Sequence, residues 1–290
     1  MVQSRKQRTL GGEVAVDGHG YWSGQRVTVR FRPAQPGAGI VFVRDDLGPG
    51  ARVPADAAHR VDVPRRTNLE TGGVQVQMVE HLLAAAYGLG IDNCEIWMNR
   101  PEAPGMDGSA SVFVDAIDAV GVVEQDAATR LYEVRETFRV ESGDAWVEAR
   151  PHESGGFSAE FRLEYPRGSG VPKQSYSAEI TPSVFRKEIS TARTFLLKSA
   201  AQTLIDQGLG THVKPTDLLV FGDSGLIGNT LRFDNECARH KTLDVVGDLA
   251  LAGLDLRARV IASRSGHKLN AELAAKLRSA AQQEINTRAA

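Results

Sequence analysis

The segment 235-NECARHKTLDVVGDLALA-252, followed by 257-RARVIAS-263 and 266-GHKLNAELAAKLRSAA-281, carries the pattern that decides the fold. The first and third stretches have the length and apolar spacing of helices, and the middle one is a short run of the strand kind. Antiparallel strands precede them in the sequence. A sheet packed against helices is therefore expected in this part of the chain.

The same order of elements occurs earlier in the chain. Short alternating or apolar runs predict strands, and an apolar residue at every third or fourth position predicts helices, one of which ends at Gly88 and Gly90. The expected elements are strands at 13–16, 26–32, 40–43 and 94–98, helices at 74–87 and 110–120, and a turn at 105–109.

The pattern then starts again after residues 121–129. Strands are expected at 133–140, 146–150, 156–165, 175–180 and 218–221, and a helix at 182–191 with Pro182 near its start. The sequence therefore predicts an α+β protein made of two similar domains, 1–124 and 125–290, each a β-sheet layered with α-helices.

Composition excludes several classes of protein. The 290 residues carry a formal net charge of −2 with no basic cluster, which argues against a nucleic-acid partner. Two cysteines suit a reducing compartment, and the N-terminal residues lack the apolar region of a secretory signal. No apolar run is long enough to span a membrane. We expect a cytoplasmic protein, and no obligate protein partner is evident.

The first candidate site lies in the helix 235–252. His240, Asp244 and Asp248 stand four residues apart, so they share one face of the helix. An imidazole and a carboxylate one turn apart can bind the same metal ion. A surface ion pair is the competing interpretation of such a His–Asp spacing.

The second candidate site is 79-VEHLL-83, where Glu80 and His81 interrupt an apolar helix. Burying two ionisable groups is costly unless they are paired or bind a metal. With His81 as a third ligand and Glu80 as the general base for an attacking water, the set would resemble a catalytic zinc site, which keeps one position open. The alternative is a glutamate that favours the helix dipole, with a histidine packed beside it.

The third candidate is His267, at the start of the last helix. It is a candidate general acid, with Asp248 available to bind its other ring nitrogen. A capping or surface histidine is the alternative. The three candidates together predict a metal-dependent hydrolase.

In order and spacing, these motifs make the chain resemble the UDP-3-O-acyl-N-acetylglucosamine deacetylases, which catalyse the committed deacetylation of lipid A synthesis. The likeness runs from residues 7–10 to the last helix. Its motifs are 79-VEHLL-83, 88-GLGIDN-93, 106-MDGSA-110, 192-ARTF-195, 231-LRF-233, 239-RHKTLDVVGD-248 and 265-SGH-267.

The resemblance implies two α+β domains with the active site between them. It implies a zinc ion (Zn²⁺) bound by His81, His240 and Asp244, and it makes the protein an amidohydrolase whose substrate is a UDP-linked acylated amino sugar. The other implied roles are general base for Glu80, general acid for His267, orientation of His267 for Asp248, oxyanion stabilisation for Thr194, substrate binding for Lys241 and lining of the acyl passage for Phe195. A His₂-carboxylate site can also hold iron.

Departures from the family pattern lie on the substrate side. Trp22 stands where the family usually has histidine, and His212-Val213 replaces a usual Gly-Gly pair. Bulkier residues restrict the close backbone approach that glycine allows. A divergent paralogue that deacetylates a different N-acylated nucleotide sugar is the alternative function. The complete set of implied ligands and proton-transfer residues argues against a non-catalytic binding protein.

Overall fold

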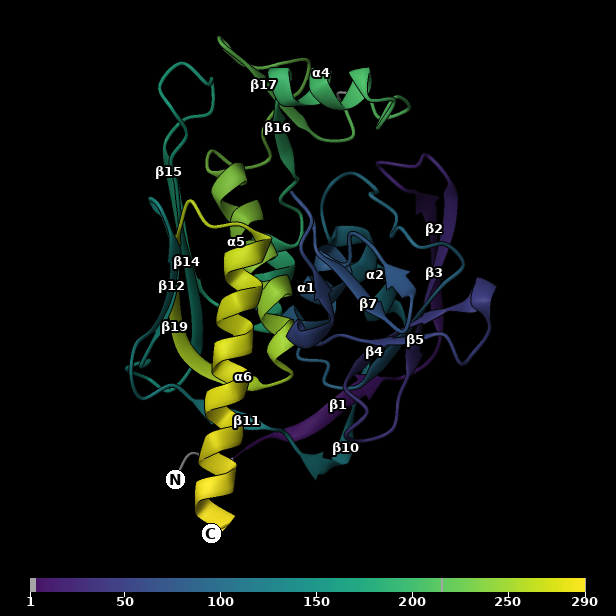
Figure 1. Cartoon of the computed structure of the whole chain (residues 1–290), viewed down its shortest axis with the longest axis vertical. Coiled ribbons are helices and arrows are strands. Elements are labelled where there is room, and N and C mark those ends of the chain that lie inside the picture. Colours follow the sequence, from purple (N-terminus) through teal and green to yellow (C-terminus); the bar gives the residue numbers. More distant parts are fainter. Residues whose placement is uncertain (1–3, 215, 290) are drawn as a thin grey trace.

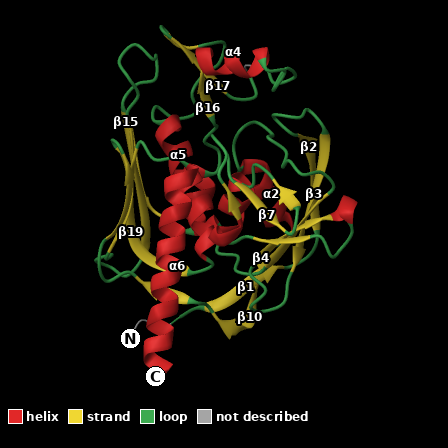
Figure 2. Cartoon of the chain, in the orientation of Figure 1, coloured by secondary structure: helices red, strands yellow, loops and turns green. Residues whose placement is uncertain are grey.

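The computed structural model of the chain describes residues 4–214 and 216–289. Two sheet-and-helix units lie side by side, and helices α1 (Glu80–Gly88) and α5 (Glu236–Leu249) pack against each other between them. Figure 2 shows strands on both flanks of this helical centre. The expected α+β class is confirmed.

The N-terminal unit is built on a five-stranded sheet. Val27, Val29 and Phe31 alternate with less buried residues and are fully buried, so one sheet face forms core. Helix α2 (Ser111–Val120) contacts both β2 and α1. The strand order is β2 (Val14–His19), β3 (Arg26–Pro33), β9 (Cys94–Met98), β4 (Ile40–Arg44) and β5 (Arg52–Pro54), with only β4 and β9 parallel among these neighbours.

A second, three-stranded sheet completes this unit. It consists of β6 (Arg60–Val61), β7 (Asn68–Thr71) and β8 (Val74–Val76), and short 3-10 helices occupy Asp45–Leu47 and Ala57–His59. Gly72 and Gly73, both with positive φ, form the turn between β7 and β8. The expected helix over 74–87 is therefore wrong at its start, because its first residues pair in the sheet and the helix begins only at Glu80.

The C-terminal unit has a sheet of six strands, and α5 and α6 (His267–Ala289) cover one of its faces. The order is β12 (Phe138–Ser142), β13 (Ala145–Arg150), β19 (Asp255–Ser263), β14 (Phe157–Leu163) and β15 (Gln174–Glu179), with β11 (Leu131–Glu133) also parallel to β19. The single strand expected over 133–140 is thus wrong: the segment divides between β11 and β12. A 3-10 turn, Ala250–Ala252, extends α5.

The segment expected as a boundary is itself a strand. β10 (Val122–Ala128) pairs antiparallel with β1 (Lys6–Leu10) in a two-stranded ribbon. The division after residue 124 falls inside β10 and remains a prediction. The helix expected over 182–191 starts as α3 (Pro182–Val184) and continues as a π-helical turn over Phe185–Ile189.

A small unit that the sequence did not predict lies beyond the N-terminal end of α5, at the top of Figure 1. It comprises β16 (Phe195–Leu197), α4 (Lys198–Asp206), β17 (Leu219–Gly222) and β18 (Gly225–Leu226). Only the strand near 218–221 was expected there.

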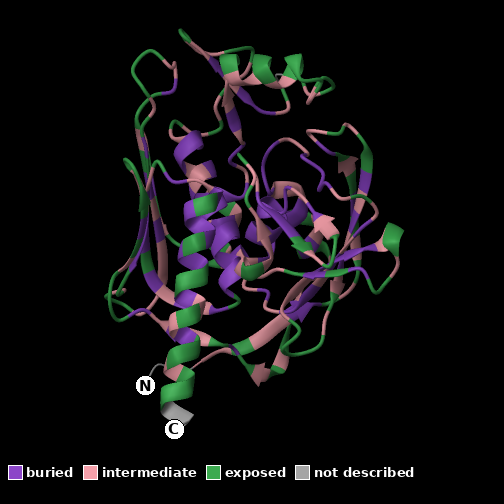
Figure 3. Ribbon diagram, in the orientation of Figure 1, coloured by how far each residue is buried: buried purple, intermediate pink, exposed green. Residues whose placement is uncertain are grey.

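Burial concentrates on the two central helices (Figure 3). Every residue of α1 except Tyr87 is buried, and so are most residues of α5. Such helices are normally apolar all round, so ionisable groups on them need partners. No helix in the described ranges is both long and apolar enough to cross a membrane.

Candidate active site

Gly247 lets α1 and α5 approach closely. A Cβ atom built at this position would lie 2.2 Å from the carbonyl oxygen of Glu80 and 3.2 Å from Cβ of Ala84. Only a glycine allows this backbone contact. The approach brings the first turn of α1, with Glu80 and His81, against the middle of α5.

Three candidate ligand atoms converge at this crossing. His81, His240 and Asp244 are buried, and one ligand atom from each lies within 4.8 Å of the other two. Asp244 Oδ1 is 3.4 Å from His240 Nε2 and 3.8 Å from His81 Nε2. The two rings are edge-to-face, with centroids 5.1 Å apart. The three residues thus form a cluster with the composition of a His₂-carboxylate metal site.

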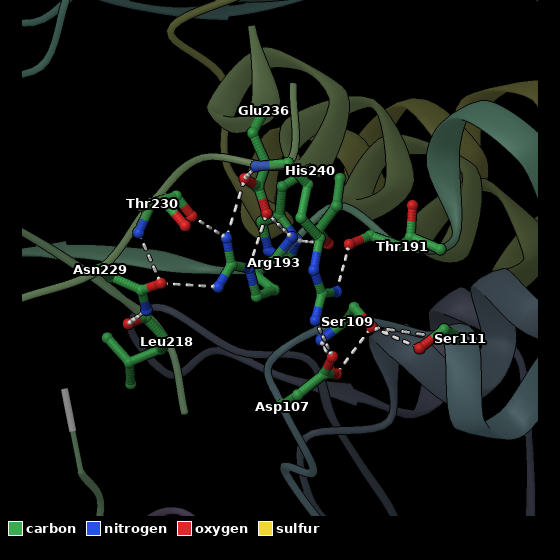
Figure 4. Close-up of polar contacts among 12 residues, drawn as sticks. Asp107, Ser109, Ser111, Thr191, Arg193, Leu218, Asn229, Thr230, Glu236 and His240 are labelled. Atoms are coloured by element: carbon green, nitrogen blue, oxygen red, sulfur yellow. Dashed lines mark hydrogen bonds and ion pairs between the residues drawn. The ribbon is translucent and has the colours of Figure 1, made fainter. Parts of the chain in front are cut away.

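Backbone contacts fix the orientation of His240. Its Nδ1 lies 3.0 Å from the carbonyl oxygen of Ala192, an atom that can only accept a hydrogen bond. Nδ1 therefore carries the proton, and Nε2 offers its lone pair toward Asp244 and His81. Figure 4 shows His240 beside the segment that carries Arg193.

The protonation states suit metal binding. Burial, reinforced by His240, lowers the pKa of His81 to about 3, and burial also lowers the pKa of His240. Burial opposes ionisation of Asp244, but the charge of Lys241 and the neighbouring histidines hold its pKa well below the usual range. The cluster thus presents two neutral imidazoles and one carboxylate, the forms that bind a metal.

Asp244 leaves one oxygen without a hydrogen bond. Its Oδ2 accepts from Lys241 Nζ at 2.6 Å, whereas the buried Oδ1 has no hydrogen-bond partner among the described residues. A buried carboxylate oxygen without a partner is costly. A cation bound between Oδ1 and the two Nε2 atoms would satisfy it, so the residues present fit a metal ion.

Glu80 lies beside this cluster. Its Oε2 accepts a hydrogen bond from the backbone N–H of Thr67 at 2.9 Å. Burial raises the pKa of Glu80 to about 7, against the lowering effect of His267 and of that hydrogen bond. A carboxylate with such a pKa can both take and return a proton near neutral pH.

His267 and Asp248 form a buried pair. Nδ1 of His267 lies 2.9 Å from Asp248 Oδ2 and 3.2 Å from Oδ1, and its Nε2 faces Asp244 Oδ2 at 4.0 Å. Burial opposes the imidazolium form, but Asp248 and then Asp244 outweigh it and raise the pKa of His267 to about 9. At neutral pH His267 therefore carries a proton that it could donate.

Three residues that the sequence analysis did not assign support this pair. Thr67 Oγ1 donates to Asp248 Oδ1 at 2.6 Å, and Asn270 Nδ2 donates to Oδ2 at 2.9 Å. Ser265 in turn donates to Asn270 at 2.9 Å. Ser265 and Asn270 lie two and three residues from His267 in the sequence, and this proximity could have identified them as its supports. Nothing in the sequence around Thr67 indicated its role.

A cavity of about 620 Å³ opens beside the cluster. Eight of the nine expected site residues line it, and the ninth, Asp248, is reached through His267. Phe195 packs edge-to-face on Tyr165 and Phe221, with ring centroids at 5.7 and 6.2 Å. From there the cavity runs under α4 and β17 along apolar side chains, among them Leu197, Ala201, Leu204 and Val220.

The substrate-side departures also lie at this cavity. Trp22 and Val213 line it, and the Arg66 guanidinium stacks 4.7 Å from the centroid of the Trp22 ring. The Trp22 backbone N–H is held by Glu102 Oε1 at 2.7 Å. His212 Nε2 donates to the Gly20 carbonyl at 2.9 Å, which ties the α4 unit to the N-terminal unit.

Comparisons with known proteins show the family of the chain. A model of the LpxC family, UDP-3-O-acyl N-acetylglycosamine deacetylase, matches residues 7–279. Proteins named UDP-3-O-acyl-N-acetylglucosamine deacetylase from Brucella ovis, Brucella canis and Brucella abortus are each 39% identical over 268 residues, which is 92% of this chain and 93% of each relative. The match spans both units and every motif that meets at the cavity. The chain therefore belongs to the LpxC family of deacetylases.

Proposed function

We propose that the chain hydrolyses the N-acetyl group of UDP-3-O-(3-hydroxyacyl)-N-acetylglucosamine, the committed step of lipid A biosynthesis, with a zinc ion held by His81, His240 and Asp244. The observation that carries the proposal is that these three ligand atoms lie within 4.8 Å of one another, and that their residues line one cavity together with Glu80 and His267. When bound, zinc supplies Lewis-acid polarisation of the amide carbonyl and activation of water.

The protein groups then divide the proton transfers. Glu80 takes the proton of the attacking water on its carboxylate, which the Thr67 N–H holds in place. His267 donates the proton on Nε2 to the departing amine, while Asp248 holds Nδ1. The C–N bond breaks as that proton arrives, so acetate and a free amine leave.

Two polar residues complete the site. Thr194, which lines the cavity, is assigned as a hydroxyl donor to the developing oxyanion. Lys241 keeps its charge because Asp244 outweighs the effect of burial and raises its pKa, and it is assigned to bind the substrate. The apolar part of the cavity, lined by Phe195, Leu197, Ala201, Leu204 and Val220, is assigned to the acyl chain.

The similarity to named deacetylases over nine tenths of both chains favours this substrate over the alternative N-acylated nucleotide sugar. The test is deacetylation of UDP-3-O-(3-hydroxyacyl)-N-acetylglucosamine by zinc-loaded protein, with metal content measured in parallel for His240→Ala. Turnover with one zinc per chain, both lost in the variant, is the expected result. Wild-type protein that binds zinc but releases no acetate would overturn the proposed substrate.

A further inference from the structure

Glu236 is a fully buried carboxylate one helical turn before His240 in α5. Its oxygens accept four hydrogen bonds: from Arg193 N, Nε and Nη2 at 3.0, 2.8 and 3.1 Å, and from Arg232 N at 2.6 Å. Figure 4 shows dashed contacts between Arg193 and Glu236, with His240 beside them. A carboxylate that accepts this many hydrogen bonds is fixed in place.

Two further hydrogen bonds hold the Arg193 guanidinium. Nη1 donates to Asn229 Oδ1 at 3.0 Å and Nη2 to the Thr230 carbonyl at 2.7 Å. Arg193 and Glu236 do not line the cavity as the described residues define it. Neither side chain is therefore placed to touch a substrate.

One peptide group links this pair to the metal site. The carbonyl of Ala192 accepts from His240 Nδ1, and the N–H of the same peptide, that of Arg193, donates to Glu236 Oε1. Because a peptide group is planar, both of its ends turn together. Residues 236 and 240, one turn apart on α5, thus hold one peptide plane from its two sides.

The same segment is held from the N-terminal unit. Thr194 N donates to the Gly108 carbonyl at 2.8 Å, and Arg232 bridges Asp107 Oδ2 and the Thr191 carbonyl, both at 2.7 Å. Asp107 and Thr191 are labelled in Figure 4. The segment that carries Ala192 and Thr194 is therefore clamped between the two units.

We propose that Arg193 and Glu236 are a positioning pair for the metal centre. By fixing the 192–193 peptide they set the direction of the Ala192 carbonyl, which in turn sets the ring orientation and tautomer of His240. The pair also places Thr194. The inference rests on the metal site of the proposed function, but it does not depend on the identity of the substrate.

Glu236→Gln is the test variant, because it keeps the shape of the side chain and removes its charge. The matched control is Glu148→Gln. Glu148 is 2% exposed and ion-paired with Arg139 at 3.1 Å, and it lies on the face of the C-terminal sheet opposite α5. Both variants remove the charge of a buried, ion-paired carboxylate, so both are expected to lower the thermal unfolding temperature.

The readout is zinc affinity, by competition with a chelator, together with the visible spectrum of the Co²⁺-substituted protein. Loss of a group that orients a metal ligand typically weakens metal binding by about 10- to 100-fold. We expect Glu236→Gln to weaken zinc binding at least about tenfold and to alter the Co²⁺ spectrum. Glu148→Gln should leave both unchanged. Equal zinc affinities and spectra for the two variants would overturn the inference.

Arg193→Lys is a second test variant, and it tests the positioning role if Glu236→Gln does not fold. Lysine keeps the charge but loses the planar fork, so zinc binding should weaken in the same direction. With substrate, kcat should fall while KM stays within about threefold, since neither residue lines the cavity. Wild-type protein that binds zinc without turnover would overturn the substrate alone. Wild-type protein that binds no zinc would overturn the metal site and this inference together.

Discussion

The imidazole of His267 and the carboxylate of Asp248 are in contact through both carboxylate oxygens, and both side chains are buried. Asp248 is the largest influence that keeps His267 protonated against burial. The proposed proton donor therefore depends on a residue that lies outside the cavity.

Asp248→Asn is expected to lower the pKa of His267 from about 9, because the amide keeps a hydrogen-bond acceptor but removes the negative charge. The basic limb of the pH profile of kcat/KM should move to lower pH. Asp144→Asn, at an aspartate whose side chain is 89% exposed, is the control and should leave the profile unchanged. An unshifted basic limb in Asp248→Asn would remove His267 from the proton-donor role.

Glu80→Ala should retain zinc and lose at least about 100-fold in kcat, the usual contribution of a general base. Glu80 is separate from the three ligand atoms, which supports retention of the metal. Acetate release and zinc content are measured on the same preparation. Turnover within a few-fold of wild type would contradict the assignment of the base.

The metal-free protein should become less stable between pH 7 and pH 9. The pKa of His267 is raised from 6.5 to about 9 in the fold, so its contribution is complete below the unfolded value and is lost as pH rises through the folded value. The pKa of Glu80 is raised to about 7, so its similar contribution is largely lost before this range. The change is on the order of 3 kcal/mol at most.

Urea unfolding of chelator-treated protein at pH 7 and pH 9 measures this change. His267→Gln has no titrating ring at the site, so its free energy of unfolding should vary less over the same range. Equal pH dependence in the two proteins would show that the His267–Asp248 pair does not control stability in this window.

The α5 motif and the contacts that hold its side chains differ in how far the sequence predicted them. His240, Asp244 and Asp248 share a face because helical spacing is local, so the sequence was sufficient there. The contact from Thr67 to Asp248 spans 181 residues and that from Ala192 to His240 spans 48, and only tertiary packing creates them.

The missed elements have physical reasons as well. Helix α4 was missed although its apolar residues keep helical spacing. It contributes no buried residue to the core, because one side lines the cavity and the other faces solvent. The start of α1 was misplaced because the helical spacing of residues 79–86 was extended back over Val74 and Val76. These two residues alternate as strand residues do and belong to β8. The Gly72-Gly73 pair before them is a hairpin signal that predicts that strand.

Gly247→Ala should destabilise the protein and weaken zinc binding together. Alanine is normally about 1 kcal/mol more favourable than glycine inside a helix, so the same substitution at an exposed helix position would stabilise the protein. Here the added Cβ would lie 2.2 Å from the Glu80 carbonyl and force α1 away from α5. Overpacking of this kind costs about 1–3 kcal/mol. Gly50→Ala, where the added Cβ meets no atom within 4 Å, is the control, and unfolding and zinc titration are compared for both variants.

Trp22→His should change the choice of acyl chain without changing zinc content. The Trp22 ring lines the cavity and is not a ligand, and its backbone is held independently by Glu102. A smaller side chain enlarges the cavity, so longer acyl chains should be favoured. We expect the ratio of kcat/KM values for two substrates that differ by one or two methylenes to change by about tenfold. Trp97→His is the matched control, because Trp97 also stacks under an arginine, Arg32 at 4.3 Å, but lies outside the cavity. Measuring kcat/KM over several acyl lengths separates the two variants, and identical profiles would show that Trp22 does not select the acyl chain.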